Sequence, residues 1–74
     1  MYLNTGKHSI KEIENTGEFI TLDDNSKWKV FPFDKAKTKL WQVLDNVTVA
    51  SNVGSKSKIT HDERNETVEA TYLG

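Results

Sequence analysis

The chain has 74 residues, which is enough for one small domain with a single hydrophobic core. It contains no cysteine, which excludes a disulfide framework and any metal or redox site built on thiolates. Ten basic and eleven acidic residues give a formal net charge of −1, so no overall field attracts the protein to nucleic acid or to an anionic membrane. The charge is unevenly distributed, because segment 25–44 holds five lysines and one aspartate between two segments that are net acidic.

The N-terminal residues 1–7 are polar, and we expect them to form a flexible arm ahead of a single β-barrel domain at 8–74. They lack the apolar core of a signal peptide, and no apolar run reaches the length of a transmembrane helix. The chain as given is therefore expected to be soluble, with no membrane partner. The first strand is expected at 8–15, where Ile10 and Ile13 are three residues apart and predict a bulge or a bend. A single helical turn is the competing interpretation.

The strongest pattern is a β-hairpin in which alternating segments at 18–22 and 27–31 flank a polar turn at 23–26. The turn sequence is Asp-Asp-Asn-Ser, and these residue types tolerate positive φ or bond their own backbone. Trp28 and Val30 point to one face of the second strand, and the lysines beside them point to the other. The indole of this strand is therefore expected in the core.

A short helix is expected near 34–44. Pro32 ends the preceding strand because proline cannot donate to a sheet ladder, and Asp34 is placed to cap a helix. Apolar residues recur at helical spacing and predict one buried face, made of Phe33, Ala36, Leu40 and Val43 or Leu44. An extended conformation is the alternative, because the lysines of this segment also alternate with its less polar residues.

Three further strands are expected at 47–51, 58–60 and 67–73, separated by a serine-rich loop at 51–57 and a charged turn at 61–66. This order suits a mainly β fold, a small closed barrel of five or six strands, because closure removes exposed sheet edges. A helix between the third and fourth strands is the order of an OB-fold, and an SH3-like barrel is the alternative. The expected core consists of Ile10, Ile13, Ile20, Leu22, Trp28, Val30, Leu40, Trp41, Leu44, Val47, Val49, Ile59, Val68, Ala70 and Tyr72.

Two runs resemble a pattern found in small uncharacterised bacterial β-barrel proteins: Leu22-x-Asp24-Asn25-Ser26-x-Trp28-x-Val30, then Trp41-x-x-x-Asp45-x-Val47-x-Val49. The pattern of that group reads L-x-D-G-S-x-W-x-V and then W-x-x-x-D-x-V-x-V. Asn25 stands where the group has glycine, an exchange that a backbone with positive φ allows. The resemblance covers roughly residues 10–50 and implies a barrel fold. It carries over no catalytic or binding residues.

One stretch combines aromatic and basic residues and is the candidate binding surface: Lys27, Lys29, Phe31, Phe33, Lys35, Lys37 and Lys39. OB-folds bind single-stranded nucleic acid with such aromatic residues and a cationic groove. The competing interpretation, that the lysines are merely solvated, is favoured by the negative net charge and the scarcity of arginine. We therefore expect first a non-catalytic domain that binds an unidentified protein or peptide. The alternative is a module that binds single-stranded nucleic acid.

Enzymatic activity, a cofactor and a metal site are not expected. The chain has no nucleophile elbow, no phosphate-binding glycine loop and no zinc-helix motif. His61 and Asp62 are adjacent and would point to opposite sides of a strand, and no third ligand is evident. We therefore interpret the charged segment 61–66 as a solvated turn.

Overall fold

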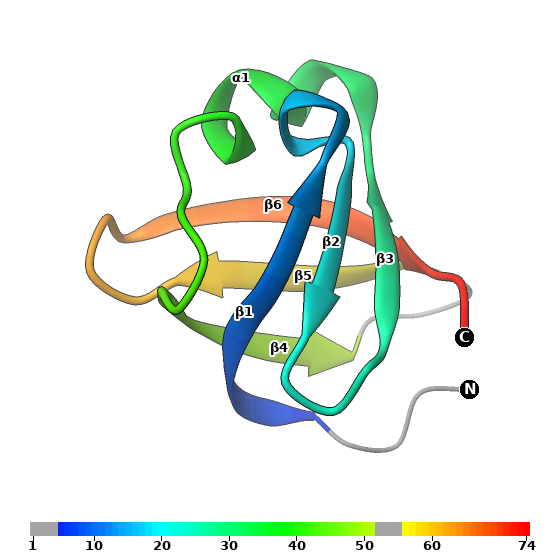
Figure 1. The fold of residues 1–74 in the computed structure, drawn as a ribbon, viewed down its shortest axis with the longest axis vertical. Helices are drawn as coiled ribbons and strands as arrows, with labels where there is room; N and C mark the ends of the chain where they lie inside the picture. The colour runs from blue at the N-terminus through cyan, green and yellow to red at the C-terminus, as the bar shows by residue number, and fades with distance from the viewer. Residues whose placement is uncertain (1–4, 52–55) are drawn as a thin grey trace.

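A computed structural model of the chain describes residues 5–51 and 56–74, which form a closed antiparallel β-barrel with one short helix (Figure 1). The described strands are β1 (Gly6–Glu14), β2 (Phe19–Leu22), β3 (Lys27–Val30), β4 (Asn46–Ser51), β5 (Lys56–His61) and β6 (Glu66–Tyr72). The helical elements are the 3-10 turns η1 (Asn15–Gly17) and η2 (Pro32–Asp34) and the helix α1 (Lys35–Thr38). The predicted small β-barrel with a helix between its third and fourth strands is confirmed.

The barrel consists of two three-stranded meanders that join along two seams. Around the barrel the strands follow the order β1-β2-β3-β6-β5-β4, and β4 pairs with β1 to close it. The first half of β1, from Gly6 to Ser9, pairs with β4, and the second half, from Ile10 onward, pairs with β2. The register shifts between Ile10 and Glu12, so the irregularity predicted from the isoleucine spacing is present.

Two strands begin two residues earlier than the sequence predicts. β1 already begins at Gly6, inside the expected arm, and residues 1–4 of that arm lie outside the described residues. β5 begins at Lys56, and residues 52–55 of the expected loop lie outside the described residues. Within the part of the chain that the structure describes, no helix is long and apolar enough to cross a membrane.

Inward-facing side chains of the strands, Trp28 among them, fill the barrel together with Trp41 from the segment between α1 and β4. Trp28 is completely buried and Trp41 is 4 % exposed, so the inward orientation predicted for both indoles is confirmed. The Trp28 ring also packs against Tyr72, with ring centroids 5.2 Å apart. Burial of this aromatic and branched surface is the main stabilising contribution in a domain of this size. The buried core consists of Ile10, Ile20, Leu22, Trp28, Val30, Trp41, Val47, Val49, Ile59, Val68 and Ala70.

Leu40 and Leu44 are not part of the core, in contrast to the prediction. Their side chains are 51 % and 77 % exposed. The prediction fails because α1 ends at Thr38 and the chain then forms only turns, so helical spacing no longer places later residues over the barrel. The expected helix over 34–44 is correspondingly reduced to a single turn.

The helix packs through polar side chains rather than through the expected apolar face. Phe33 is 75 % exposed, whereas Asp34 and Thr38 are buried. Thr38 Oγ1 donates to the carbonyl of Gly17 at 2.7 Å, which fastens α1 to η1 over one end of the barrel (Figure 1). The Asp34 carboxylate does not cap the helix, because it accepts the backbone N–H of Glu69 at 3.0 Å. Helical spacing therefore identified the existence of this element but not its buried side.

The turn between β2 and β3 has the conformation that its residue types predict. The Asn25 N–H donates to the carbonyl of Leu22, and the Leu22 N–H donates to the carbonyl of Ser26, both at 2.9 Å. Asn25 has a φ of 68°, in the left-handed region. A type I turn followed by a left-handed residue is a common three-residue hairpin loop. Asparagine is enriched at positive φ, which is the physical basis for asparagine at a position where the resembling pattern has glycine.

Candidate binding surface

Two phenylalanines lie where β3 ends and η2 begins. Pro32 occupies the first position of η2, so Phe31 keeps an extended backbone while Phe33 lies within the turn. Their rings meet edge to face, with centroids 5.9 Å apart and planes at 89°. Phe31 is half-buried and Phe33 is mostly exposed. A second ring thus holds an exposed aromatic ring in a fixed orientation.

A hollow of about 290 Å³ opens beside Phe31 on the outside of the barrel. Its lining consists of Lys29, Val30, Phe31, Pro32 and Thr71. Lys29 and Thr71 face each other across the β3–β6 pair, so they supply one ammonium and one hydroxyl. Phe31 and Pro32 supply an apolar wall. A small apolar hollow with a few polar groups is the usual composition of a binding site in proteins.

The lysines of the predicted surface do not all lie at this hollow. Lys29 lines it, whereas Lys27 lies at the opposite end of β3, where its backbone N–H donates to the carbonyl of Gly74. The Lys27 ammonium is 3.8 Å from a carboxylate oxygen of Glu14. The structure therefore brings together Lys29, Phe31 and Phe33, and it separates Lys27 from them.

The lysines of the helical segment are partly paired with acids. Lys35 lies 3.7 Å from Glu18, and Lys37 lies 3.8 Å from Asp34. Exposed pairs of this kind stabilise a protein by about 0–1 kcal/mol and are readily exchanged for other partners. Lys29 and Lys39 form no ion pair within residues 5–51 and 56–74. The net positive charge of this region is therefore available to a partner.

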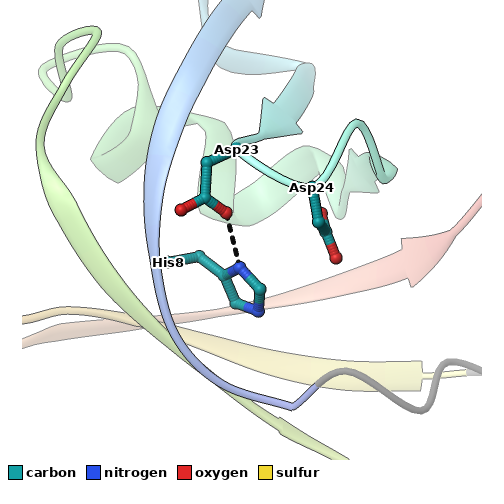
Figure 2. A group of neighbouring side chains, drawn as sticks. All are labelled: His8, Asp23 and Asp24. Carbon is teal, nitrogen blue, oxygen red and sulfur yellow. Dashed lines mark hydrogen bonds and ion pairs between the residues drawn. The ribbon is translucent and has the colours of Figure 1, made fainter.

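A second polar cluster lies where β1 begins, beside the β2–β3 turn, and Figure 2 shows its three side chains. His8 is buried, and its Nδ1 is 2.6 Å from Oδ1 of Asp23. The backbone N–H of Ser9 donates to the other carboxylate oxygen at 3.3 Å. The hydrogen bond to His8, with help from Ser9, lowers the pKa of Asp23 although partial burial opposes the shift. This pair fastens the start of β1 to the turn.

Asp24 has a separate role within the same turn. Its Oδ1 accepts the backbone N–H of Ser26 at 3.0 Å and the Ser26 hydroxyl at 2.6 Å. The Ser26 oxygen in turn accepts the indole N–H of Trp28 at 2.9 Å. The relay satisfies a buried donor that would otherwise be costly. The D-x-S-x-W part of the sequence pattern is thus explained by the turn and the core.

One ligand atom from each of His8, Asp23 and Asp24 lies within 4.8 Å of the others, a spacing that a divalent cation could bridge. Hydrogen bonds that fix the turn already engage all three groups, and Asp24 takes no part in the dashed bond drawn in Figure 2. The neighbouring hollow of about 520 Å³ is lined by Lys7 as well as by Asp23 and Asp62. We therefore assign this cluster a role in stability.

His61 is buried, which corrects its interpretation as part of a solvated turn. It is the last residue of β5 and 2 % exposed. Its Nδ1 accepts the backbone N–H of Arg64 at 3.1 Å, so the proton of the neutral ring lies on Nε2, which is 2.7 Å from Oδ2 of Asp45. The Trp41 ring packs 5.1 Å from the imidazole. His61 is two residues after the buried Ile59, and alternate residues of a strand point to the same face, so the sequence did contain a signal for this inward position.

Asp45 belongs to the same buried network. The hydrogen bond from His61 lowers the pKa of Asp45, and the backbone N–H of Gln42, at 2.9 Å, adds to this effect. The Trp41 indole N–H donates to Glu66 at 3.0 Å. The second part of the sequence pattern, W-x-x-x-D, is therefore also explained by hydrogen bonds that hold the barrel together.

Comparison of the chain with protein-family models, with curated proteins and with solved structures finds no match. The chemistry of the surface must therefore be inferred from its own geometry. That geometry combines a fixed exposed phenylalanine, a small apolar hollow and an ammonium without an ion-pair partner among the described residues. We call the surface formed by Lys29, Phe31, Pro32, Phe33 and Thr71 the Phe33 surface.

Proposed function

We propose that the protein is a small non-catalytic binding domain that docks a protein or peptide partner on the Phe33 surface. The observation that carries the proposal is that Phe33 is 75 % exposed and meets the ring of Phe31 edge to face, while Phe31 itself lines the hollow. Exposed apolar side chains that stand singly are ordinary, but an oriented ring beside a hollow resembles the aromatic anchors of protein interfaces. The two histidine–aspartate pairs support a non-catalytic role, because their hydrogen bonds fasten strands and turns.

A capture experiment tests this function. Immobilised wild-type protein, the F33A variant and the V43A variant are exposed to the same cell extract, and the retained proteins are identified by mass spectrometry. Val43 is a matched control because it is also exposed and apolar but belongs to the turns after α1. We expect the wild type and V43A to retain a common partner that F33A loses by about tenfold or more, as truncation of an aromatic anchor does. Equal retention by all three proteins would contradict the assignment of the surface.

The second candidate function is binding of single-stranded nucleic acid. We infer that the barrel is OB-like rather than SH3-like, because α1 lies between β3 and β4 and covers one end of the barrel. OB-folds bind oligonucleotides over their second and third strands, and Lys29 lies on β3. The negative net charge and the ion pairs of Lys27, Lys35 and Lys37 favour the first function over this one.

A titration with short oligonucleotides separates the two functions. Nucleic-acid binding requires shifts of the amide resonances at Lys29, Phe31 and Phe33 that weaken as salt is raised, because released counterions drive such binding. An absence of any shift at low salt removes the second candidate and leaves the first unaffected.

A further inference from the structure

We propose that the Phe33 surface recognises an acidic peptide, which inserts one aliphatic side chain into the hollow beside Phe31 and places a carboxylate on Lys29. The inference rests on the proposed function and names the chemistry of its partner. Three properties of the surface carry it: the size of the hollow, the arrangement of the two rings and the balance of charge.

The size of the hollow suits one side chain. At about 290 Å³ it lies at the lower limit of pockets that bury most of a small-molecule ligand, which are about 300–1,000 Å³. Phe31 and Pro32 form an apolar wall, and Thr71, the register partner of Lys29 across the β3–β6 pair, also lines the hollow. An aliphatic side chain that enters this space removes apolar surface from water on both sides of the contact.

The arrangement of the rings favours a peptide over stacked bases. Proteins that bind single strands present aromatic faces on which successive bases stack. Here the planes of Phe31 and Phe33 meet at 89°, and Phe31 is half-buried, so the pair offers no continuous stacking platform. One open ring beside a hollow instead suits a peptide that covers Phe33 while its neighbouring side chain is buried.

The charge of the surface selects acidic residues. Lys29 lines the hollow and forms no ion pair within residues 5–51 and 56–74. The acid adjacent to Phe31 is Glu69 of β6, whose backbone carbonyl accepts the N–H of Phe31. Glu69 is in register with Lys58 across the β5–β6 pair, although the two side chains form no ion pair within the described residues. A carboxylate two or three residues from the buried side chain of a peptide would meet an ammonium that has no ion-pair partner among the described residues.

Defined peptides test the inference by isothermal titration and by amide shifts. The first probe is a capped peptide of alternating glutamate and serine with one central leucine. In the second probe the leucine is replaced by alanine, and in the third every glutamate is replaced by glutamine. We expect the first peptide to bind and to shift resonances at Lys29, Phe33 and Thr71. The second should bind about tenfold more weakly, because several methylene-sized groups are no longer buried. The third should bind about threefold to tenfold more weakly, because it lacks the charge that pairs with Lys29.

Protein variants locate the contacts. F33A should weaken binding of the first peptide, and V43A should not. K29E should abolish the preference for glutamate over glutamine, whereas K29R should keep it. These side chains are exposed, so circular dichroism should show that all four variants remain folded.

The outcomes separate failure of this inference from failure of the proposed function. Equal binding of the glutamate and glutamine peptides, or of the leucine and alanine peptides, overturns the acidic-aliphatic assignment. If no peptide binds while capture from the extract still depends on Phe33, the inference is wrong and the binding function stands. If capture is also independent of Phe33, both are wrong.

Discussion

At the residue scale, the Ser26 hydroxyl links the β2–β3 turn to the centre of the core. It accepts the Trp28 indole N–H and donates to Asp24, and both contacts are shorter than 3 Å. We predict that S26A lowers the free energy of unfolding by about 1–3 kcal/mol, because the buried indole N–H loses its acceptor. Urea denaturation followed by tryptophan fluorescence measures this loss.

The matched control for that variant is S9A. Ser9 also donates a hydroxyl to an aspartate, but its contact with Asp23 is 3.5 Å long and exposed. Its removal should change stability by about 0.5 kcal/mol or less. Equal effects of S26A and S9A would show that the indole does not depend on this relay.

Leu44 is the residue whose local conformation is least suited to its side chain. The Asp45 N–H donates to the carbonyl of Gln42, and Leu44 has a φ of 77° while Val43 does not have a positive φ. Leu44 therefore occupies the third position of a type II turn, where glycine is preferred. We predict that L44G raises the free energy of unfolding by about 0.5–1 kcal/mol, because a left-handed leucine costs more than the extra freedom of glycine.

V43G is the control for that gain. Val43 is exposed like Leu44, but glycine at a negative φ brings only additional freedom to the unfolded chain. This variant should be less stable than the wild type in the same urea titration. A loss of stability in both L44G and V43G would contradict the claim that the backbone of Leu44 is strained in this turn.

Sequence patterns predicted the conformation of a residue well where a single local property, such as tolerance of positive φ or alternation along a strand, decides it. Asn25 at positive φ and Trp28 in the core both follow from local chemistry and alternation. Leu44 was placed in the core because its spacing fitted a helix, and no property of leucine signals an exposed left-handed position. The partner of a buried polar group is likewise set by the tertiary fold, as for His61 and Asp45.

At the scale of elements, α1 depends on a close approach to η1 that only glycine allows. A Cβ on Gly17 would lie 2.5 Å from Thr38 Oγ1 and 2.7 Å from the backbone nitrogen of Lys39. Gly17 also has a φ of 95°. We predict that G17A lowers the free energy of unfolding by about 2–4 kcal/mol, from backbone strain together with overpacking against the helix.

G6A separates these two causes. Gly6 also has a positive φ, of 117°, but an added Cβ would meet no atom of the described residues within 4 Å. This variant should lose only the contribution of backbone strain, about 1–2 kcal/mol. Thermal denaturation of both variants measures their losses of stability, and the larger loss in G17A gives the contribution of the contact with α1. Equal losses of stability in G17A and G6A would show that α1 can move away from the added Cβ without a loss of stability.

The same contact explains why the sequence predicted the helix but not its packing. Apolar spacing assumes that a helix is held by an apolar stripe, whereas α1 is held by the Thr38 hydroxyl and the Asp34 carboxylate. The binding surface was predicted in part for a related reason. Alternation placed Lys29 outside, but no sequence pattern indicated the 3-10 turn at Pro32, beside which the rings of Phe31 and Phe33 meet edge to face.

At the scale of the whole molecule, two histidine–aspartate pairs fasten the barrel near its closing seam. His8 and His61 lie on β1 and β5, and both are in register with Val47 of the intervening strand β4. His8 bonds to Asp23 of the β2–β3 turn, and His61 bonds to Asp45 just before β4. The number and order of the strands predicted a closed barrel, because closure removes exposed edges, but these cross-connections required the register of three strands.

These pairs predict how stability changes with acid. The pKa of Asp23 and that of Asp45 both lie below the ordinary value of 3.8, mainly because each carboxylate accepts a hydrogen bond from histidine. The unfolded chain therefore binds protons at a higher pH than the folded chain does. The stabilisation from each pair is present above pH 3.8 and is lost as the pH falls through the lowered folded-state pKa.

We predict that the free energy of unfolding declines as the pH is lowered below about 4 and that D45N flattens this decline more than D23N. The Asp45 side chain is 26 % exposed and that of Asp23 is 49 % exposed, so solvent screens the Asp23 pair more strongly. Urea denaturation at a series of pH values on either side of 3.8 provides the measurement. E63Q, which removes an exposed acid outside both pairs, should keep the decline of the wild type. An unchanged decline in D45N would mean that closure of the barrel does not depend on the ionised Asp45, and the buried His61 network would then have to hold with a neutral partner.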